Sequence, residues 1–365
     1  MNLRRPLLGT ARLALPAALS AGLALAAVAA GTGGVADHPP GTSGTVAAAA
    51  STDDPVDHVI AISVDGLNPE AIRRLGRAGT PALHRLMANG ASTLNARSEY
   101  ERTITLPNHT GMLTGRHVLG ADGHQVTFND DNGSTLRQTS GGYVRGIFDV
   151  VHNRGGSTAF YSAKHKFDYL DRSWDGTHGD LDRVGADDGR DKIDRYYVDT
   201  EPANVTRLIA RLRTAPDDFS FVHLAHPDRA GHAYGFMSAR YLTAVTQADQ
   251  QVGRILDALN ETGLRAHTNV VLTADHGGRG PNHSDPTKAD NYTVPFMVWG
   301  VGVPRGADLY SLNADVRRRP GTGRPTYAGR QPIRNGEVAN LTADLLDLPR
   351  VPGSAFDTLQ DLRVR

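Results

Sequence analysis

Short apolar runs that alternate with helical segments constrain the fold of this chain more than any other feature. His58–Val64 (HVIAISV) is apolar almost throughout, as expected for a strand buried on both faces of a parallel sheet. Long helices are predicted over Glu201–Arg213 and Ser238–Asn260. The remaining predicted strands are Ser157–Tyr161, Phe219–Leu224, Asn269–Ala274 and Val294–Trp299. The alternation predicts a layered α/β domain.

Acidic residues and histidines follow these strands at the points where the strands end. Asp65 follows the first strand, and Asp275 and His276 follow the run VVLTA. Asp228 and His232 come after a third strand, and their spacing of four residues puts both side chains on one face of a helical turn. Because ligands bind at the carboxyl edge of open parallel sheets, we expect these side chains to form a site there.

His283, in GPNHSD, adds a third histidine, and no histidine follows it in the chain. Three aspartates and three histidines suit two divalent ions held by oxygen and nitrogen ligands. Any one of these residues alone is more commonly a helix cap or a hydrogen-bonded polar group, but six of them at strand ends favour a two-metal site. The predicted ligands are Asp65, Asp228, His232, Asp275, His276 and His283.

The composition excludes several other kinds of site. The chain of 365 residues has no cysteine, so it has no disulfide, no cysteine-ligated zinc, no iron–sulfur cluster and no thiol nucleophile. Its 39 Lys and Arg residues balance 39 Asp and Glu residues. A net charge of zero gives no electrostatic reason to expect nucleic acid or anionic lipid as a partner.

The first residues have the features of a targeting segment. After Arg12 no charged residue occurs until Asp37, and Leu and Ala dominate between them. We predict a signal peptide over residues 1–30, with Arg4-Arg5 weakly suggesting the twin-arginine type, and hence a secreted or periplasmic protein with no membrane span after processing. Retention of the segment as an anchor is the alternative. A flexible linker is predicted over 31–55, followed by one catalytic domain over 56–365, with an inserted cap region over 130–200.

A hydroxyl residue is the candidate nucleophile. In Thr103–Gly111 (TITLPNHTG), a proline follows Thr105 by two residues and precedes an apolar segment, which places Thr105 near a helix N-terminus. The helix dipole and a metal ion would both lower the pKa of its hydroxyl group there. In isolation, an ordinary threonine cap is the more common explanation.

These residues resemble the motifs of the alkaline phosphatase superfamily, and within it the type I phosphodiesterase/nucleotide pyrophosphatase family. The resemblance implies a three-layer sandwich with a central, mostly parallel sheet flanked by helices. The matching motifs, in the family's order, are VDG at Val64–Gly66, T-x-PNH-x-x-x-x-TG at Thr105–Gly115, PD-x-x-GH-x-YG at Pro227–Gly235, ADHGG at Ala274–Gly278 and NHSD at Asn282–Asp285.

The resemblance also implies roles for individual residues. Asp228, His232 and His283 would bind one metal ion, most simply zinc. The second ion would be bound by Asp65, Asp275, His276 and the hydroxyl group of Thr105. Asn129, in HQVTFND, is similar to the family's asparagine that binds a phosphoryl oxygen. The implied reaction is hydrolysis of a phosphoric diester or pyrophosphate through a phospho-threonine intermediate.

Two departures concern the substrate. Nucleotide-cleaving members carry an aromatic residue directly after the nucleophile, whereas this chain has Leu106, which argues against a nucleobase pocket. The segment AKHKF, with Lys164 and Lys166, resembles the corresponding segment of phosphonoacetate hydrolase. Either lysine would then bind an anionic group of the substrate, and a solvated lysine pair is the equal alternative.

Other functions remain as alternatives. A phosphomonoesterase or a phosphonoacetate hydrolase-like enzyme would use the same site. A sulfatase needs a Cys or Ser in a C/S-x-P-x-R motif, and this chain instead has Thr105-Leu106-Pro107-Asn108-His109. A non-catalytic relative would be expected to lack the nucleophile or a ligand, and none is missing. The leaving group and the oligomeric state are not predicted.

Overall fold

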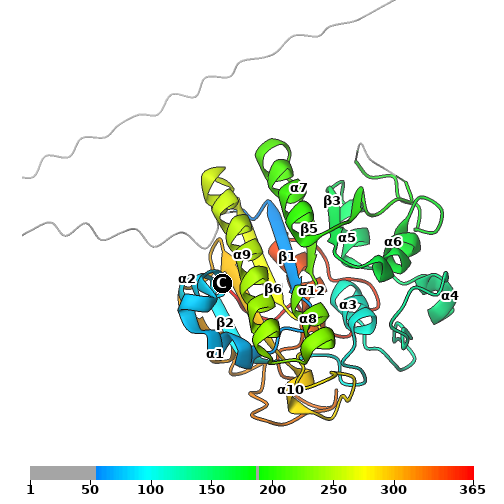
Figure 1. Ribbon diagram of the computed structural model, residues 1–365. Helices are drawn as coiled ribbons and strands as arrows, with labels where there is room; N and C mark the ends of the chain where they lie inside the picture. The colour runs from blue at the N-terminus through cyan, green and yellow to red at the C-terminus, as the bar shows by residue number, and fades with distance from the viewer. Residues whose placement is uncertain (1–54, 186–188) are drawn as a thin grey trace, which may run out of the picture. The chain divides into compact units, whose positions relative to one another are not determined.

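The computed structural model of the protein describes residues 55–185 and 189–365. The predicted signal peptide (1–30) and the predicted linker up to residue 54 lie outside the described residues. Within them the chain forms one sheet with helices on both faces (Figure 1). This arrangement confirms the predicted α/β sandwich. None of the described helices is both long and apolar enough to cross a membrane.

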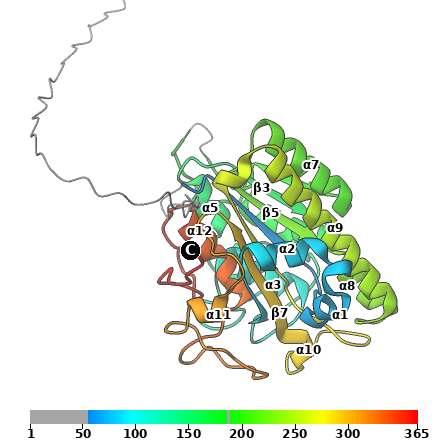
Figure 2. The same cartoon turned by 90° about the vertical axis from the view of Figure 1, so that its left-hand side faces the viewer.

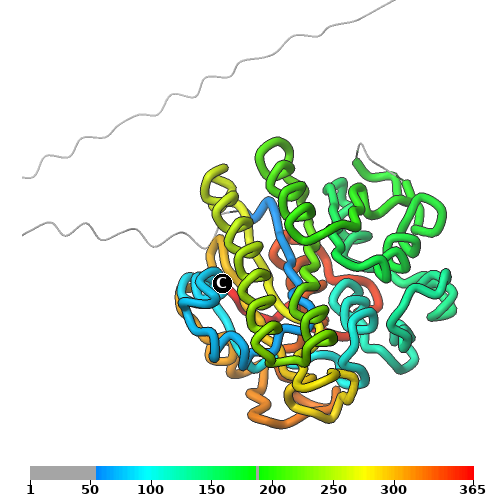
Figure 3. The backbone as a smooth tube through the Cα atoms, viewed as in Figure 1, coloured from blue at the N-terminus to red at the C-terminus, as the bar shows by residue number. Residues whose placement is uncertain are grey.

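The described strands form an eight-stranded sheet in the order β4-β3-β5-β1-β6-β7-β2-β8. β1 (His58–Val64) pairs in parallel with β5 (Phe219–Leu224) on one side and with β6 (Thr268–Thr273) on the other. Figure 3 shows this first strand, in blue, beside much later parts of the chain. Among the described strands, only β7 (Thr293–Gly300) runs opposite to its neighbours. The other strands are β2 (Ala91–Arg97), β3 (Thr158–Ser162), β4 (Arg195–Val198) and β8 (Ala307–Asp308).

Helices cover both faces of the sheet, with α7 and α9 on one side of the strands and α5 and α12 on the other (Figure 2). The first layer contains α1 (Pro69–Gly79), α2 (Pro81–Asn89), α7 (Glu201–Thr214), α8 (His226–Tyr234) and α9 (Ala239–Glu261). The second contains α3 (Thr105–Thr114), α5 (Ile147–His152) and α12 (Val338–Leu345). The shorter helices are α4 (Leu136–Ser140), α6 (Asp168–Trp174), α10 (Ala289–Tyr292), α11 (Leu309–Leu312) and the 3-10 turns η1 (His165–Phe167), η2 (Leu264–His267) and η3 (Asn335–Glu337).

Local sequence signals set the helix starts. The side chain of Asn68 accepts a hydrogen bond from the N–H of Glu70, so it caps α1 ahead of a proline at the first helical position. The side chain of Ser238 accepts a hydrogen bond from the N–H of Tyr241 and so caps α9. Thr80 precedes α2, but its hydroxyl donates to the carbonyl of Gly76 and makes no cap. The helices predicted over 201–213 and 238–260 agree with α7 and α9 within one residue at each end.

The structure contains strands that the apolar pattern did not predict. β2 (ASTLNAR) has few large apolar residues, and β4 has four residues at an edge of the sheet. Both are held by pairing with a neighbouring strand, which hydrophobic periodicity does not reveal. Residues 130–200, predicted as a cap insertion, contain α4, α5 and α6 together with β3 and β4 at one edge of the sheet.

Candidate active site

Four neighbouring parallel strands bring the candidate residues to one edge of the sheet. Asp65 follows β1 directly, and Asp275 lies two residues beyond the end of β6. β5 leads into α8, whose first turn carries Asp228, and Lys164 lies two residues beyond the end of β3. The carboxyl ends of the strands therefore meet at the edge where ligands bind in open parallel sheets.

The turn after β1 requires a glycine. Gly66 has φ of +71°, and a Cβ atom on it would lie 3.1 Å from the Cα of Asp228. Its N–H donates to Oδ1 of Asp275 at 3.0 Å. The absence of a side chain thus allows α8 to approach the end of β1, which brings Asp228 beside Asp65.

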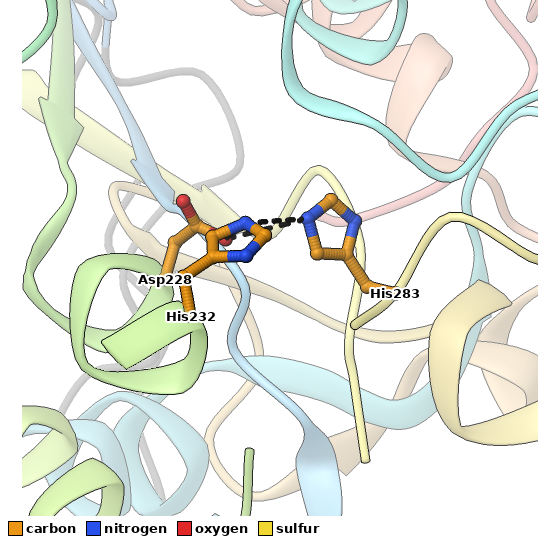
Figure 4. A group of neighbouring side chains, drawn as sticks. All are labelled: Asp228, His232 and His283. Atoms are coloured by element: carbon orange, nitrogen blue, oxygen red, sulfur yellow. Dashed lines mark hydrogen bonds and ion pairs between the residues drawn. The ribbon is translucent and has the colours of Figure 1, made fainter. Parts of the chain in front are cut away.

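Asp228, His232 and His283 converge on one point (Figure 4). Nε2 of His232 lies 3.3 Å from Oδ1 of Asp228 and 3.0 Å from Nε2 of His283. Nε2 of His283 lies 3.6 Å from the same aspartate oxygen. Ligand atoms of a tetrahedral zinc ion, each about 2.0–2.1 Å from it, are roughly 3.3 Å from one another. The three atoms therefore have the spacing of three ligands of one ion.

A second group surrounds Nε2 of His276. Oδ2 of Asp275 is 3.2 Å from this atom, Oδ1 of Asp65 is 3.6 Å from it and Oδ1 of Asp228 is 4.0 Å from it. All four side chains are buried. Asp65, Asp228 and His276 form a group that could hold a metal ion. Because Asp228 also belongs to the first group, the two candidate metal positions are adjacent.

Backbone carbonyls fix the tautomers of two of the histidines. Nδ1 of His276 donates to the carbonyl of Gly277 at 2.8 Å, and Nδ1 of His283 donates to the carbonyl of Thr103 at 2.6 Å. A neutral imidazole that donates from Nδ1 has its lone pair on Nε2. In both histidines the Nε2 atom is therefore free to bind a metal, as in many protein metal sites.

Several buried polar atoms at this edge lack a hydrogen-bond partner. They are Oδ1 of Asp65, Oδ1 of Asp228, Oδ2 of Asp275 and Nε2 of His276. A buried acceptor without a donor costs about 1–3 kcal/mol, and charged groups cost more. Four such acceptors side by side fit a bound cation, and the mixture of carboxylate and imidazole ligands fits zinc.

Burial and charge set the protonation of the group. Burial lowers the pKa of His283 to about 3, so this imidazole is neutral near pH 7. Burial alone would raise the pKa of Asp65, but Lys164 and His223 together hold it well below its ordinary value. Burial and the charge of Asp65 raise the pKa of Asp275 well above its ordinary range. The ammonium group of Lys164 cannot neutralise Asp65, Asp228 and Asp275 together, so ionising all three carboxyl groups needs a further cation, as a bound metal ion would supply.

Thr105 is the first residue of α3, as the sequence predicted, and it is buried. The carbonyl oxygen of Thr105 accepts a hydrogen bond from Nδ1 of His109 at 2.8 Å. The N–H of Leu106 donates to Oδ1 of Asn129 at 2.9 Å, which leaves the side-chain NH₂ of Asn129 as its donor group. Leu106 itself is fully buried and so offers no surface to a substrate.

The two predicted substrate lysines occupy different surroundings. Nζ of Lys164 lies 2.6 Å from Oδ2 of Asp65, 2.6 Å from Oδ2 of Asp228 and 3.5 Å from Oγ1 of Thr105. Nζ of Lys166 is 3.6 Å from a single carboxylate, that of Asp130, which is 93% exposed. Burial and the charge of Lys164 lower the pKa of Lys166. Lys164 thus belongs to the carboxylate cluster, whereas Lys166 is weakly paired beside it.

Two further residues support the cluster, and sequence reasoning did not single them out. His223, the penultimate residue of β5, donates from Nε2 to Oδ2 of Asp65 at 2.8 Å. Glu201, the first residue of α7, accepts hydrogen bonds from the N–H groups of Ala225 and His226 at the start of α8. His223 lies at a strand end in HLAHPD, the same position that identified the ligands. Nothing in the sequence marks Glu201, because its partners are backbone groups of a distant segment.

Comparison with known proteins agrees with this site. The family model of type I phosphodiesterases/nucleotide pyrophosphatases matches residues 59–293. The chain belongs to this family. The match includes all but the first residue of β1, together with α3, α8 and both candidate metal groups.

The individual relatives have low sequence identity to this chain. The chain is 26% identical to human ectonucleotide pyrophosphatase/phosphodiesterase family member 1 over 59% of its own length and 23% of the relative. It is 25% identical to venom phosphodiesterase of Naja atra over 71% of its length and 31% of the relative. The chain thus spans about a quarter to a third of these curated relatives. An inactive variant of murine ectonucleotide pyrophosphatase/phosphodiesterase 5 in complex with AMP has the same fold, with a TM-score of 0.57 and 15% identity over 84% of this chain and 99% of that one.

Proposed function

We propose that the protein is a secreted, metal-dependent hydrolase of phosphoric diesters or pyrophosphates that acts through a phospho-threonine at Thr105. The observation that carries the proposal is the group of four buried, unpartnered ligand atoms. Lys164 contacts two of these residues, Asp65 and Asp228, and its Nζ is also 3.5 Å from Oγ1 of Thr105. Membership of the phosphodiesterase family supports the choice of reaction. Similarity to a venom phosphodiesterase supports the same reaction.

Thr105 supplies the nucleophile in this proposal. Its Oγ1 forms a bond to phosphorus as the bond from phosphorus to the leaving oxygen breaks, and the hydroxyl proton passes to solvent. The leaving group of a diester takes a proton from water and departs as an alcohol, whereas that of a pyrophosphate departs as a phosphate. A water oxygen then bonds to phosphorus, the bond to Oγ1 breaks, and Thr105 regains its proton. Its place at a helix N-terminus favours the negative charge that develops.

Asn129 would bind the phosphoryl group during both steps. Its carbonyl oxygen is engaged by the N–H of Leu106, so its NH₂ group is the donor available to a phosphoryl oxygen. A donor held in this way stabilises charge that develops on phosphoryl oxygens in the transition state.

Two divalent ions, most simply Zn²⁺, would supply Lewis acidity, lowering the pKa of the nucleophile and neutralising charge on the leaving oxygen. Asp228, His232 and His283 would hold one ion. Asp65, Asp275, His276 and the Thr105 hydroxyl would hold the other. The unpartnered Oδ1 of Asp228 and Nε2 of His276, and the tetrahedral spacing around Asp228, support this set.

Lys166 favours a substrate with a second anionic group. Its side chain is largely buried, yet it meets one exposed carboxylate at 3.6 Å, so a substrate anion would compete easily for it. This observation also favours a second candidate function, hydrolysis of a small anionic phosphonate or phosphomonoester at the same site. Secretion, through residues 1–30 and a linker up to residue 55, is part of the proposal and is supported by the uncharged apolar N-terminal run.

A panel of substrates tests the proposal. Purified, zinc-loaded protein would be assayed with bis-p-nitrophenyl phosphate, p-nitrophenyl phosphate, the nitrophenyl ester of thymidine monophosphate and phosphonoacetate. We expect kcat/KM to be highest for a diester. A preference for phosphonoacetate or for the monoester would replace the proposal with the second candidate, and no turnover of any substrate would contradict both.

A further inference from the structure

Lys164 divides the oxygens of two carboxylates into two sets. Nζ lies 2.6 Å from Oδ2 of Asp65 and 2.6 Å from Oδ2 of Asp228. The Oδ1 atoms of the same two residues have no hydrogen-bond partner and are buried. These Oδ1 atoms are the ones near Nε2 of His276, at 3.6 and 4.0 Å. The lysine and the candidate metal positions therefore use different oxygens of each carboxylate.

A second donor saturates Oδ2 of Asp65. The N–H of Ala163 donates to Nδ1 of His223 at 3.2 Å, so the proton of this neutral ring is on Nε2. That Nε2 donates to Oδ2 of Asp65 at 2.8 Å. Oδ2 of Asp65 thus accepts hydrogen bonds from both Lys164 and His223, whereas Oδ2 of Asp228 accepts one from Lys164.

The charges around Lys164 explain why it stays in this position. It is 12% exposed, and two carboxylates contact it at hydrogen-bond distance. Asp228 belongs to both candidate metal groups, with His232 and His283 beside it in the first, whereas Asp65 belongs only to the second. A single ammonium group thus connects one ligand of the first group with one ligand of the second.

We propose that Lys164 is a positioning residue shared by both metal sites: it holds Oδ2 of Asp65 and Oδ2 of Asp228, so that each carboxylate presents only Oδ1 to its ion. The inference rests on the metal-dependent function proposed above and adds to it a physical link between the two ions. It assigns Lys166 alone to the substrate. His223 has the same positioning role, restricted to the ion that Asp65 binds.

The roles assigned to Lys164, His223 and Lys166 predict a different pattern of zinc binding for a variant of each residue. Zinc would be titrated, without substrate, into metal-free protein in competition with a chromogenic chelator. Loss of a group that orients a metal ligand typically weakens metal binding about 10–100-fold. We expect Lys164→Met to weaken both zinc equivalents at least about tenfold. His223→Leu should weaken one equivalent, and the matched control Lys166→Met should weaken neither.

A chemical rescue separates the role of the ammonium group from a folding defect. The chain has no cysteine, so Lys164→Cys offers alkylating reagents a single thiol. Alkylation with 2-bromoethylamine restores an ammonium group on a side chain of nearly the length of lysine. Alkylation of the same preparation with iodoacetamide adds a neutral group instead. We expect the first product to recover both zinc affinities to within about threefold of the wild-type values and the second to recover neither.

Two results would overturn the inference. Lys164→Met could bind both zinc ions as tightly as the wild type, or the neutral product could recover affinity as well as the charged one. Either result would leave the proposed hydrolase intact. Conversely, if the three variants show the expected zinc-binding patterns but the wild-type protein cleaves no phosphoester, the proposed function is contradicted and the role of Lys164 stands.

Discussion

The imidazole rings of His276 and His283 are stacked, with their centroids 3.5 Å apart and their planes 6° from parallel. The first ring belongs to the group around Asp65, and the second to the group around Asp228. Each ring is also anchored through Nδ1 to a backbone carbonyl. The loop between them therefore folds back so that one pair of rings forms part of both candidate metal positions.

Replacing His283 should remove one metal ion. His283→Asn deletes a ligand whose Nε2 is 3.0 Å from that of His232 and 3.6 Å from Oδ1 of Asp228. We expect the variant to contain about one zinc equivalent fewer per chain and to lose turnover by more than about 100-fold, with partial recovery in excess zinc. Elemental analysis of the purified protein measures the first effect. His267→Asn, in which the replaced histidine is half-exposed and paired with Asp57, is the control and should keep the wild-type metal content.

Unchanged metal content and turnover in His283→Asn would show that another residue completes the first metal group. The neighbouring carboxylates of Asp285 and Asp290 would then be the candidates to exchange for asparagine. The family membership of the chain would be unaffected by that result.

Thr105→Ala should separate metal binding from chemistry. The six Asp and His side chains remain in this variant, so the metal content should stay close to the wild-type value while turnover falls below a few per cent. Thr105→Ser keeps a hydroxyl group and should retain measurable turnover. A phosphoryl group trapped in the wild type at low pH should map to Thr105 by mass spectrometry. Substantial turnover by Thr105→Ala would mean that water attacks phosphorus directly.

Much of this arrangement could be predicted because it is local in the sequence. A buried parallel strand has a continuous apolar run, and the residue after it lies at the ligand-binding edge, so β1 and β5 were identified within their observed bounds. The helical spacing of Asp228 and His232 likewise follows from four residues of sequence, and their side chains meet at 3.3 Å.

The remaining features depend on contacts between distant segments. The separation of Lys164 from Lys166 arises because β3 lies beside β5, which brings Lys164 alone within reach of Asp228. β2 is a strand because it pairs with β7, more than 190 positions later in the chain. Hydrophobic periodicity contains no information on either pairing.

Metal removal should lower thermal stability. An ion that binds only the folded state stabilises it by about 4 kcal/mol when its concentration is about 1,000 times its Kd. For a domain of this size, we expect dialysis against a chelator to lower Tm by roughly 5–15 °C and to abolish turnover. Scanning calorimetry with and without added zinc measures the shift. Full activity in protein shown by elemental analysis to be metal-free would contradict the two-metal proposal.

The carboxyl cluster around Arg317 predicts a pH dependence of stability away from the active site. Nε of Arg317 donates to Oε1 of Glu337 at 3.0 Å, and its two Nη atoms contact Asp357 at 2.6 Å and Asp361 at 2.7 Å. One guanidinium group thus faces three carboxyl groups. Burial raises the pKa of Glu337 to about 8, an effect that Arg317 only partly offsets. Burial also raises the pKa of Asp357, to about 6.

Glu337→Gln should remove part of this pH dependence. Glu337 binds its proton more tightly in the folded than in the unfolded protein, so its stabilising contribution is complete below the unfolded pKa, near 4.5, and is lost as the pH rises through about 8. Glutamine keeps the oxygen that accepts from Arg317 and cannot ionise. Between pH 5 and pH 9 the free energy of unfolding of the wild type should therefore fall by more than about 1 kcal/mol relative to that of the variant. Urea unfolding at both pH values measures the difference, and Glu261→Gln, at an exposed ion pair with Arg213, should follow the wild type. Parallel curves for the wild type and Glu337→Gln would show that the buried carboxyl group of Glu337 does not titrate in this range.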